Sequence, residues 1–552
     1  MPLVFGVFGA GTAAAEPSPA PNMETIPTEL GSRVTVVTPN DRFTTPHAQI
    51  SPFLYLNRCK NNCTVNGANV NDARSQMSTI PGPGSYTIGE FANVFGQTTT
   101  TATTGTCLNP DGTSSTTTCT DDAGCASLGT GAVCDTADYE WAQVVQCMKE
   151  VYSPYAITVQ DTVPAGGVSY TEAIIAGQPG DIGLGMDILG IAPLAGDCSA
   201  QDNVISFSFA NHHAARDRVF NICWTAAQET AHAFGLDHEF SFPAGDLGGP
   251  MLPAGGMGTA SDGLSACNDP MTYSTLCSGE KFFRNETARC GEYMSRDCRC
   301  GGTQNSHQKL INVFGQGQSL IPPPTVSVTL PTDGATVTPN FNTVVNAGSR
   351  RGVARVELWL NGYKWNSKIG VPFSDGGQPN PASYSLVAPN GVPNGNMFLV
   401  EKAYDDLGLE TDSPPITIHL GAPCTDDSAC ATGQHCNTGA ATATVPTGGC
   451  YWDPPTGNLG DKCTFNQFCT SGICQGNAGD MICTQDCIVG VSDSCPAKYD
   501  CVMTTGTVGL CFPSTGGGGC CNASTGNGEL LAHFGFAGLV LGFVVRRRKA
   551  KR

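Results

Sequence analysis

The sequence has few charged residues, and basic residues are especially few. Asp, Glu, Lys and Arg make up 14% of its 552 residues, and 28 Lys and Arg stand against 47 Asp and Glu. Six of the basic residues fall in the last seven positions, so the rest of the chain is more acidic than the net charge of −19 indicates. Because such a chain repels phosphate backbones, we expect no nucleic-acid partner.

Several common catalytic motifs are also absent. The sequence contains no phosphate-binding loop and no serine nucleophile elbow, which argues against nucleotide hydrolysis and against a serine hydrolase of the α/β type. Its 68 glycines and 37 prolines argue against a mainly helical protein and predict a loop-rich fold with many strands. A length of 552 residues predicts three or four domains rather than one core.

Cysteine is absent from residues 301–423, although the chain contains 28 cysteines. Fourteen precede this gap and fourteen follow it, and the last two are the adjacent Cys520 and Cys521. Exported proteins with disulfides commonly reach this density, whereas a reducing cytosol does not support it. The two clusters therefore predict separately closed disulfide frameworks in an oxidising compartment, and they argue against a cysteine nucleophile.

An apolar run lies near each end of the chain. Leu3 to Gly11 precede three alanines, a pattern suited to signal peptidase, so residues 1–15 are predicted to be a signal peptide. They lack a basic leading segment, which predicts a start further upstream. Near the other end, residues 514–528 form a Gly/Cys segment and a polar spacer, and residues 529–552 form a predicted hydrophobic helix with a basic end.

This tail resembles the MYXO-CTERM protein-sorting tails of myxobacterial surface proteins, which combine a Gly/Cys motif, one hydrophobic helix and a terminal Arg cluster. The resemblance implies export to the cell surface or outer membrane. It also implies processing near Cys520 or Cys521 that removes the helix, with release of the protein as one outcome. A permanent membrane anchor formed by the hydrophobic helix is the alternative.

Two modules precede this tail. Residues 323–420 begin with a proline run and continue as short alternating strands separated by turn residues, which predicts an all-β sandwich. They resemble a bacterial immunoglobulin-like domain, which implies a spacer or adhesion module. Residues 424–513 hold 12 cysteines and little continuous apolar sequence, which predicts a small disulfide-rich module.

A short cysteine motif recurs along the chain. CTDDSAC at Cys424–Cys430 is similar to CTDDAGC at Cys119–Cys125, and a looser copy, CTFNQFC, runs over Cys463–Cys469. The earliest copy follows a Thr-rich loop, so residues 99–136 are predicted to be a cysteine-rich insertion within a first domain of residues 30–315. No CxxC pair repeats at a regular separation, which argues against a zinc ribbon.

The most informative stretch is NICWTAAQETAHAFGLDHE, at residues 221–239. Its apolar residues recur with a helical period, and a helix is predicted to end near Gly235, the residue type that allows a sharp turn. Gln228 and His232 then lie one helical turn apart on the same face, and the reversal at Gly235 lets His238 return toward them. Side chains placed in this way can share one metal ion.

This string resembles the zinc signature HExxHxxGxxH of the metzincin metallopeptidases. Four residues stand at matching positions, namely Glu229, His232, Gly235 and His238. The resemblance implies an α+β peptidase domain in which the two histidines hold zinc. It further implies that Glu229 is the general base that takes a proton from metal-bound water.

A second string, NDPMTYS, matches the Met-turn that metzincins place below the metal. Met271 stands at the position of the family's methionine, which implies structural support for the site. Tyr273 matches the tyrosine that can approach the zinc in the astacin and serralysin branches, which implies a catalytic or ligand role. Strand-like residues 204–209 are expected to be the edge strand to which a substrate peptide adds in extended form.

The sequence departs from the family pattern at Gln228, which stands where the first ligand histidine is expected. An amide oxygen is a poorer zinc donor than imidazole, and loss of one ligand costs on the order of 3–5 kcal/mol of binding free energy. The candidates to complete the ligand set are Gln228 itself, Tyr273, and the upstream His212 and His213.

These patterns predict an exported, cell-surface zinc metalloendopeptidase whose partners are extracellular proteins or peptides and, through the C-terminal helix or its processed tail, the membrane. The alternative is a catalytically inactive metzincin-like pseudopeptidase that acts as a surface adhesin or binding scaffold. The predicted fold class is multidomain, with an α+β metzincin-like domain, an all-β immunoglobulin-like sandwich, a small disulfide-rich module and a C-terminal hydrophobic helix.

Overall fold

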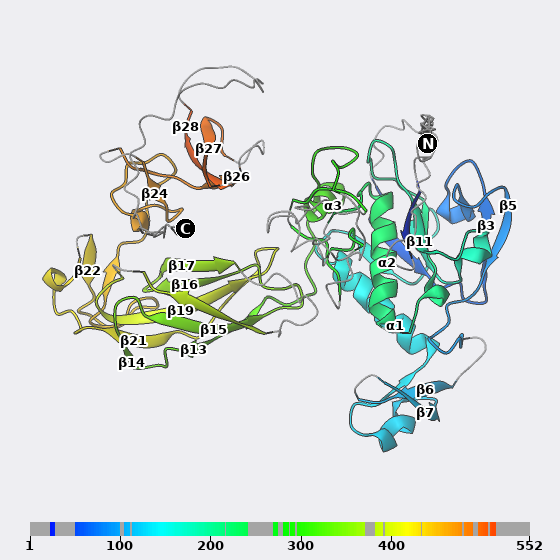
Figure 1. The fold of residues 1–552 in the computed structure, drawn as a ribbon, viewed down its shortest axis with the longest axis horizontal. Coiled ribbons are helices and arrows are strands. Elements are labelled where there is room, and N and C mark those ends of the chain that lie inside the picture. The colour runs from blue at the N-terminus through cyan, green and yellow to red at the C-terminus, as the bar shows by residue number, and fades with distance from the viewer. Residues whose placement is uncertain are drawn as a thin grey trace, which may run out of the picture.

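The computed structural model describes residues 23–27 and 50–514, with gaps at 100–103, 111–112, 216, 241–268, 274–279, 286, 293–294, 370–380, 390–391, 432, 477–479, 489–494 and 506–507. Strands predominate in this part of the chain, and its α-helices are α1 (Ala137–Tyr152), α2 (Arg218–Ala233) and α3 (Ser306–Phe314) (Figure 1). No helix within the described residues is long and apolar enough to cross a membrane. The predicted signal peptide (1–15), the segment 515–528 and the predicted C-terminal helix (529–552) lie outside the described residues.

The first domain is built on a six-stranded sheet with the order β1-β11-β12-β10-β2-β9. β9, β2, β10 and β12 pair in parallel, whereas β11 runs antiparallel to β12, and β1 runs antiparallel to β11. The strands are β1 (Met23–Pro27), β2 (Phe53–Asn57), β9 (Thr158–Gln160), β10 (Thr171–Ile175), β11 (Ile188–Pro193) and β12 (Ile205–Ser208). A smaller sheet of the same domain consists of β3 (Cys63–Gly67), β4 (Met77–Ser78) and β5 (Gly84–Ile88).

The strand that was expected at the edge of the sheet, residues 204–209, is an interior strand. It forms β12, which lies between β10 and β11, and all four of its residues are buried. The expectation was wrong because a short apolar pattern does not reveal how many neighbours a strand has. β11 lies outside β12, and β1 forms the edge by pairing along β11 from Met23 opposite Pro193 to Pro27 opposite Ile188.

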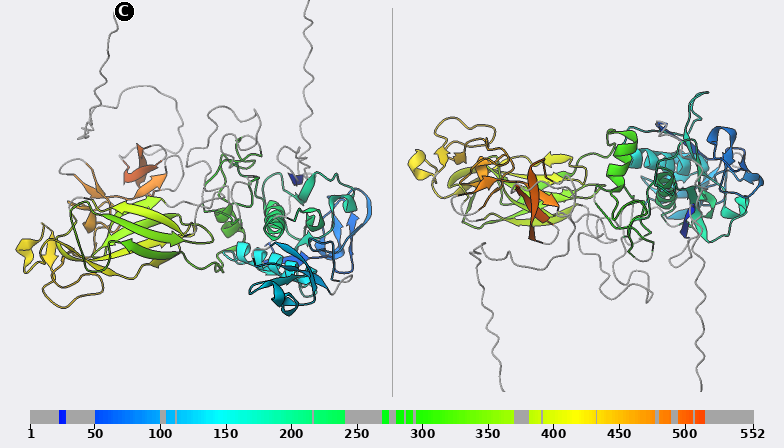
Figure 2. Two further views of the ribbon diagram at one scale, coloured as in Figure 1. Left: turned by 60° about the horizontal axis from the view of Figure 1, so that its bottom comes forward. Right: turned by 90° about the horizontal axis from the view of Figure 1, so that it is seen from above.

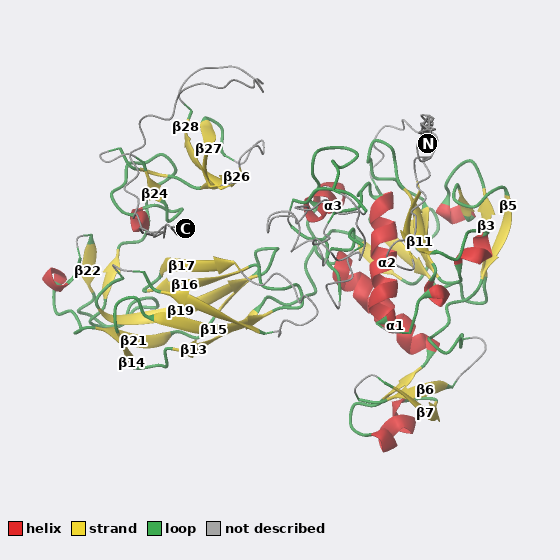
Figure 3. Cartoon of the chain, in the orientation of Figure 1, coloured by secondary structure: helices red, strands yellow, loops and turns green. Residues whose placement is uncertain are grey.

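Two long helices pack side by side in the first domain (Figure 3). α1 begins where the hydroxyl of Thr136 accepts a hydrogen bond from the Tyr139 N–H at 3.1 Å. A disulfide between Cys147 and Cys223 joins α1 to α2. Since α2 also lies against β11 and β12, the helix that carries the candidate site is fixed on two sides.

α2 ends as the sequence predicts. Gly235 adopts a φ of +86°, in the left-handed region. A Cβ atom at this position would lie 2.1 Å from the carbonyl oxygen of Cys198. Glycine is therefore required here both by the backbone conformation and by the close approach of the neighbouring segment.

Residues 325–420 form the predicted β-sandwich. One sheet has the order β13-β15-β18, and the other has the order β14-β21-β19-β16-β17 with β20 beside β19. The core between them includes Val345, Val356, Leu358 and Leu399, all fully buried. The strands are β13 (Thr325–Leu330), β14 (Ala335–Val337), β15 (Asn342–Gly348), β16 (Arg355–Leu360), β17 (Tyr363–Ile369), β18 (Ala382–Val387), β19 (Gly395–Tyr404), β20 (Glu410–Asp412) and β21 (Ile416–Leu420).

The sandwich is docked on the first domain, beside which it lies in both views of Figure 2. Arg351 of the sandwich is fully buried and donates hydrogen bonds to the carbonyl oxygen of Phe283 at 2.9 Å and to Asp406 at 2.9 and 2.8 Å. Arg284 of the first domain is also buried and donates to the carbonyl oxygen of Arg351 at 2.5 Å. Two buried guanidinium groups thus share one carboxylate across the boundary between the domains.

The disulfides confirm the predicted disulfide-rich module, and their pairing follows one repeated pattern. Each of four small units has a crossed pairing, first cysteine with third and second with fourth. One unit is the predicted insertion and three follow the sandwich. The pairs are Cys107–Cys125 with Cys119–Cys134, Cys424–Cys436 with Cys430–Cys450, Cys463–Cys474 with Cys469–Cys483, and Cys487–Cys501 with Cys495–Cys511. Every described disulfide stays on one side of the cysteine-free gap, as expected.

Short strands accompany these disulfides. In the insertion they are β6 (Gly105–Leu108), β7 (Ser114–Cys119) and β8 (Val133–Asp135). In the later units they are β22 (Gln434–Cys436), β23 (Cys450–Trp452), β24 (Cys474–Gln475), β25 (Ile482–Cys483), β26 (Asp486–Ile488), β27 (Tyr499–Thr505) and β28 (Val508–Pro513).

The insertion is a rearranged copy of the later units. Asp122 accepts a hydrogen bond from the Cys134 N–H at 2.8 Å, as Asp427 does from Cys436 at 2.8 Å. The strand that pairs with this cysteine comes last in the later unit, as β23, but first in the insertion, as β6. The two units therefore have the same arrangement of paired strands and crossed disulfides, but the chain starts at a different strand of that arrangement in each.

A buried carboxyl group lies in the middle of the main sheet. Glu172 of β10 is fully buried and accepts hydrogen bonds from Asn57 at 2.7 Å and Gln76 at 2.6 Å. Burial raises the pKa of Glu172 from 4.5 to about 7, although the two amides act in the opposite direction.

We expect this group to make the stability of the protein depend on pH. The folded state retains the Glu172 proton between pH 4.5 and about 7, whereas the unfolded state loses it, so the free energy of unfolding should fall as pH rises through this range, by on the order of 3 kcal/mol. Glu172→Gln should remove that part of the dependence. Urea unfolding of both proteins at several pH values measures it, and parallel curves would contradict the expectation.

The turn after α2 gives a second stability prediction. Gly235→Ala should lower the free energy of unfolding by more than about 2 kcal/mol, because a left-handed alanine costs about 1–2 kcal/mol and its Cβ also meets the Cys198 carbonyl. Gly183, with a φ of +78°, a ψ of 18° and no atom closer than 3.8 Å to its missing Cβ, is the matched control. Gly183→Ala should show the backbone cost alone. Equal losses in urea unfolding would mean that the Cys198 contact is unimportant.

Candidate metal and active site

α2 brings three of the predicted site residues together in its last turns. Gln228, Glu229 and His232 are all fully buried. The chain then reverses at Gly235, whose N–H donates to the His232 carbonyl oxygen at 2.8 Å. This reversal returns His238 to the helix, so that its ring centre lies 4.6 Å from that of His232.

The two imidazoles meet through their Nε2 atoms, which lie 3.0 Å apart. His232 Nδ1 donates to the carbonyl oxygen of Leu236 at 2.8 Å, and His238 Nδ1 donates to Glu292 at 3.2 Å. Because Leu236 can only accept, and an ionised Glu292 can only accept, both rings carry their neutral-form proton on Nδ1. The Nε2 lone pairs therefore face each other, and a proton or a metal cation between them is needed to relieve the repulsion.

The spacing of these nitrogens suits a metal ion. Two nitrogens bound to one tetrahedral zinc at about 2.0–2.1 Å lie roughly 3.3 Å apart, close to the 3.0 Å between the Nε2 atoms. A histidine that binds metal commonly donates its other N–H to a carboxylate or a backbone carbonyl. His238 donates in this way to the Glu292 carboxylate, and His232 donates to the Leu236 carbonyl oxygen.

Glu292 is a member of the site that the sequence did not reveal. Burial raises the pKa of its carboxyl, but hydrogen bonds from His238 and Arg296 outweigh burial and hold that pKa below its ordinary value. Arg296 donates to Glu292 at 2.6 Å and to Asp237 at 2.5 Å. Glu292 thus stays ionised and orients His238. It follows His238 by 54 residues, with no motif to mark it.

Glu229, the predicted general base, follows Gln228 in α2 and is fully buried. Neither of its carboxylate oxygens has a hydrogen-bond partner among the described residues. Burial raises the pKa of Glu229 well above its ordinary value, and His238 acts in the opposite direction. A Cβ atom on Gly190 of β11 would lie 2.8 Å from Glu229 Oε1, so glycine in this strand makes room for the carboxyl.

Gln228 has a structural role in addition to its candidate role as a metal ligand. Its Nε2 donates to the carbonyl oxygen of Pro270 at 2.7 Å, and Trp224, one turn earlier, donates to the same oxygen at 2.8 Å. A carbonyl acceptor requires the NH2 group there, which fixes the amide orientation. Gln228 Oε1 then has no hydrogen-bond partner among the described residues. The amide therefore anchors the following turn and leaves one donor oxygen for a cation.

Tyr273 lies beside His238, and Met271 precedes it by two residues. Met271 is fully buried, and its carbonyl oxygen accepts from the Glu239 N–H at 2.9 Å. The ring of Tyr273 packs on His238 with centres 4.4 Å apart. Asp269 supports the turn by accepting from the Met271 N–H at 2.8 Å and the Arg284 N–H at 2.7 Å.

His212 and His213 do not join this group. They precede the first residue of α2, whereas His232 lies in its last turn, a separation of about 20 Å along the helix. His212 Nε2 lies 2.8 Å from the carbonyl oxygen of Met186. Burial, together with Arg218, lowers the pKa of His213 to about 3. The suggestion that these histidines complete the ligand set is therefore wrong.

The chain is similar to several solved structures over part of its length. Three similar solved structures are the fibronectin(III)-like modules of Clostridium thermocellum CbhA (16% identity, 17% of this chain and 94% of that chain, TM-score 0.14), an endo-beta-1,4-mannanase from Thermotoga petrophila (12%, 22% and 24%, 0.14) and a calcium binding mutant of Bacteroides uniformis beta-glucuronidase 2 (12%, 30% and 20%, 0.13). No curated protein matches the chain. Residues 324–399 match the family described as a bacterial Ig domain, in agreement with the predicted immunoglobulin-like sandwich.

Proposed function

We propose that residues 30–315 form a metzincin-like zinc endopeptidase domain and that the protein cleaves extracellular proteins. The convergence of two histidines carries this proposal. Their Nε2 atoms lie 3.0 Å apart while acceptors engage both Nδ1 atoms, beside a buried carboxyl group with no other partner among the described residues. Such a group of donors and base is what metal-assisted hydrolysis requires.

His232 and His238 would hold zinc through Nε2, with Gln228 Oε1 as the third protein donor. Bound zinc would acidify a water molecule and polarise a peptide carbonyl. An amide oxygen contributes less to zinc affinity than the imidazole it replaces. Glu292, which keeps the His238 Nδ1 proton in place, and Leu236, which does the same for His232, offset part of this loss by fixing the ring orientations.

Glu229 would move protons during the reaction. Its raised pKa favours the protonated form, so its carboxylate is basic enough to take a proton from water at Oε1 or Oε2. The same oxygen would then give the proton to the amine nitrogen that leaves. Burial keeps bulk water from taking over either step.

A peptide substrate would add in extended form along the outer edge of β11. Gly190 brings the backbone of this strand next to Glu229. In the full chain, β1 pairs along that edge, with Ile26 opposite Gly190. Substrate and β1 would therefore compete for one set of backbone hydrogen bonds.

The second candidate function is a metzincin-like pseudopeptidase that acts as a surface adhesin or scaffold. The hydrogen bond from Gln228 Nε2 to Pro270 favours it, because this side chain already has a structural task. Under either function we propose the same route to the cell surface. Residues 1–15 direct export, and a MYXO-CTERM-like tail at residues 514–552 places the protein at the cell surface or outer membrane. The tail is then processed and the protein released, or the C-terminal helix anchors it.

Zinc content and peptide cleavage together test the function. We expect near-stoichiometric zinc in the oxidatively folded full chain, measured by mass spectrometry, and a zinc dissociation constant about 10²- to 10³-fold lower in Gln228→His. Glu229→Gln should keep zinc and lose at least about 10²-fold in cleavage rate.

Two matched controls accompany this experiment. Trp224→Phe removes the other hydrogen bond to Pro270 and should leave zinc affinity unchanged. Glu172→Gln neutralises a buried carboxyl outside the site and should leave cleavage unchanged. Zinc bound by Gln228→His but not by the natural protein would establish the pseudopeptidase. Unchanged cleavage by Glu229→Gln would exclude Glu229 as the general base.

Competition with β1 predicts that shortening the chain activates it. Deletion of residues 1–28 should raise the cleavage rate of an extended peptide by about tenfold or more, because the edge of β11 becomes open. Deletion of residues 1–20 leaves β1 intact and should change little. The measurement is the initial rate of cleavage of a fluorogenic peptide, and equal rates in the two shortened proteins would show that β1 does not limit access.

A further inference from the structure

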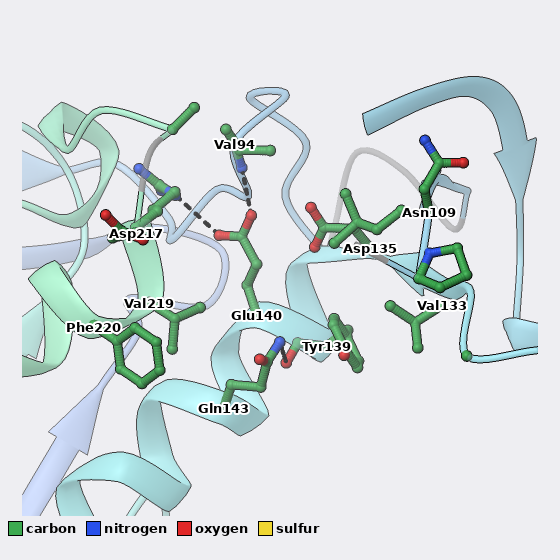
Figure 4. Close-up of a pocket in the computed structure, with 15 residues that line it drawn as sticks. Val94, Asn109, Val133, Asp135, Tyr139, Glu140, Gln143, Asp217, Val219 and Phe220 are labelled. Carbon is green, nitrogen blue, oxygen red and sulfur yellow. Dashed lines mark hydrogen bonds and ion pairs between the residues drawn. The ribbon is translucent and has the colours of Figure 1, made fainter. Parts of the chain in front are cut away.

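A cavity of about 420 Å³ lies where the cysteine-rich insertion meets the two long helices of the first domain (Figure 4). The insertion contributes Leu108 and Val133, α1 contributes Tyr139 and Glu140, and α2 contributes Val219 and Phe220. Phe220 is 41% exposed, although it is a large apolar side chain. The lining thus combines apolar side chains, including one partly exposed aromatic ring, with polar ones such as Asn109 and Gln143.

The inner end of the cavity carries carboxyl groups. Asp135, the last residue of β8, lines the cavity but is only 2% exposed, and its Oδ1 has no hydrogen-bond partner among the described residues. Burial raises the pKa of Asp135 to about 8, and the neighbouring Glu140 carboxyl, which shares a hydrogen bond with it, adds to the rise. A buried, unsatisfied acceptor of this kind is costly unless something binds it.

The nearby basic residue is already engaged. Arg218 donates through Nε to Glu140 at 3.0 Å, through Nη1 to the His213 carbonyl at 2.8 Å and through Nη2 to the Ala92 carbonyl at 2.7 Å. Glu140 also accepts from the Val94 N–H at 2.8 Å. The charges of Arg218 and Glu140 therefore balance each other, and Asp135 is left as the group that can receive a ligand.

We propose that this cavity binds a primary ammonium group on an apolar chain, the chemistry of a lysine side chain, with Asp135 Oδ1 as its partner. None of these residues belongs to the candidate metal site, so the proposal stands apart from the proposed function. It gives the insertion a role in capturing an extracellular peptide.

The available acceptors favour an ammonium group over other ligands. A divalent cation takes about six or more oxygen ligands, and a guanidinium group is suited to two carboxylate oxygens at once. The cavity offers one buried carboxylate oxygen without a partner among the described residues of its lining, because hydrogen bonds engage both Glu140 oxygens. The apolar stem of lysine would lie against Val133 and Phe220.

Calorimetry of the full-length, oxidised chain tests the proposal. The probes are Nα-acetyl-lysine N-methylamide and its uncharged counterpart Nα-acetyl-norleucine N-methylamide at pH 8.5, where the lysine ammonium is still charged. We expect about 10- to 100-fold tighter binding of the lysine derivative. Equal binding of the two probes, or no binding of either, would overturn the proposal.

Proton release provides a second reading on the same protein. The groups that face Asp135 are Glu140 and Tyr139 from α1 and Asp217 and Arg218 from α2. An ammonium ligand favours the ionised form of Asp135, so at pH 7 binding should release close to one proton, and apparent affinity should rise about tenfold from pH 6 to pH 7. Heats measured in buffers of different ionisation enthalpy give the proton count. Binding without proton release would contradict the assignment to Asp135.

Asp135→Asn removes the charge at constant size and should abolish both the preference for lysine and the proton release. Glu172→Gln, a buried carboxyl of the main sheet, is the matched control and should retain both. If Asp135→Asn does not fold, the comparison of the two probes on the natural protein still decides. Binding of n-butylammonium as tight as that of the lysine derivative would assign the cavity to free amines, and weaker binding would assign it to a protein side chain.

Discussion

The pairing of His232 with His238 in the first domain depends on the tight reversal of the chain after α2. Gly235, with a φ of +86°, turns against the backbone of Cys198, and a disulfide from Cys198 to Cys300 fixes that neighbouring segment. Because the turn is short and cannot widen, His238 returns to within hydrogen-bond distance of His232. The two nitrogens are thus brought together by the backbone and need no flexible loop to find each other.

A continuous set of contacts links this site to the sandwich. Asp269 accepts from the backbone N–H groups of Met271 and Arg284, and the Arg284 side chain donates to the carbonyl oxygen of Arg351 in the sandwich. Since both guanidinium groups are buried and share Asp406, separating the domains would leave buried charges without partners. The sandwich, expected from its sequence to be a spacer or adhesion module, therefore also supports the turn beneath the histidines.

The sequence predicts where helices and site residues lie along the chain better than it predicts which distant segments they contact. Helical periodicity located α2, and motif spacing predicted that Glu229, His232 and His238 lie close together, because both depend on local geometry. The partners of these residues depend on distant chain segments. Pro270, which receives the Gln228 amide, lies 42 residues away, and β12 proved to be interior rather than an edge. The fourth crossed disulfide unit, with Cys487–Cys501 and Cys495–Cys511, lies within the predicted disulfide-rich module, but no copy of the short cysteine motif marks it as a repeat.

The different starting point of the insertion has a consequence for how domains are combined. Its first and last strands, β6 and β8, pair with each other, with Thr106 opposite Asp135, so the chain leaves the parent domain and rejoins it at nearly the same place. A unit with adjacent ends can be added to a loop without stretching the host. Asp135 stands at that junction and also lines the cavity. Exchange of such units at one loop would thus change the lining of the cavity while the host domain stays the same.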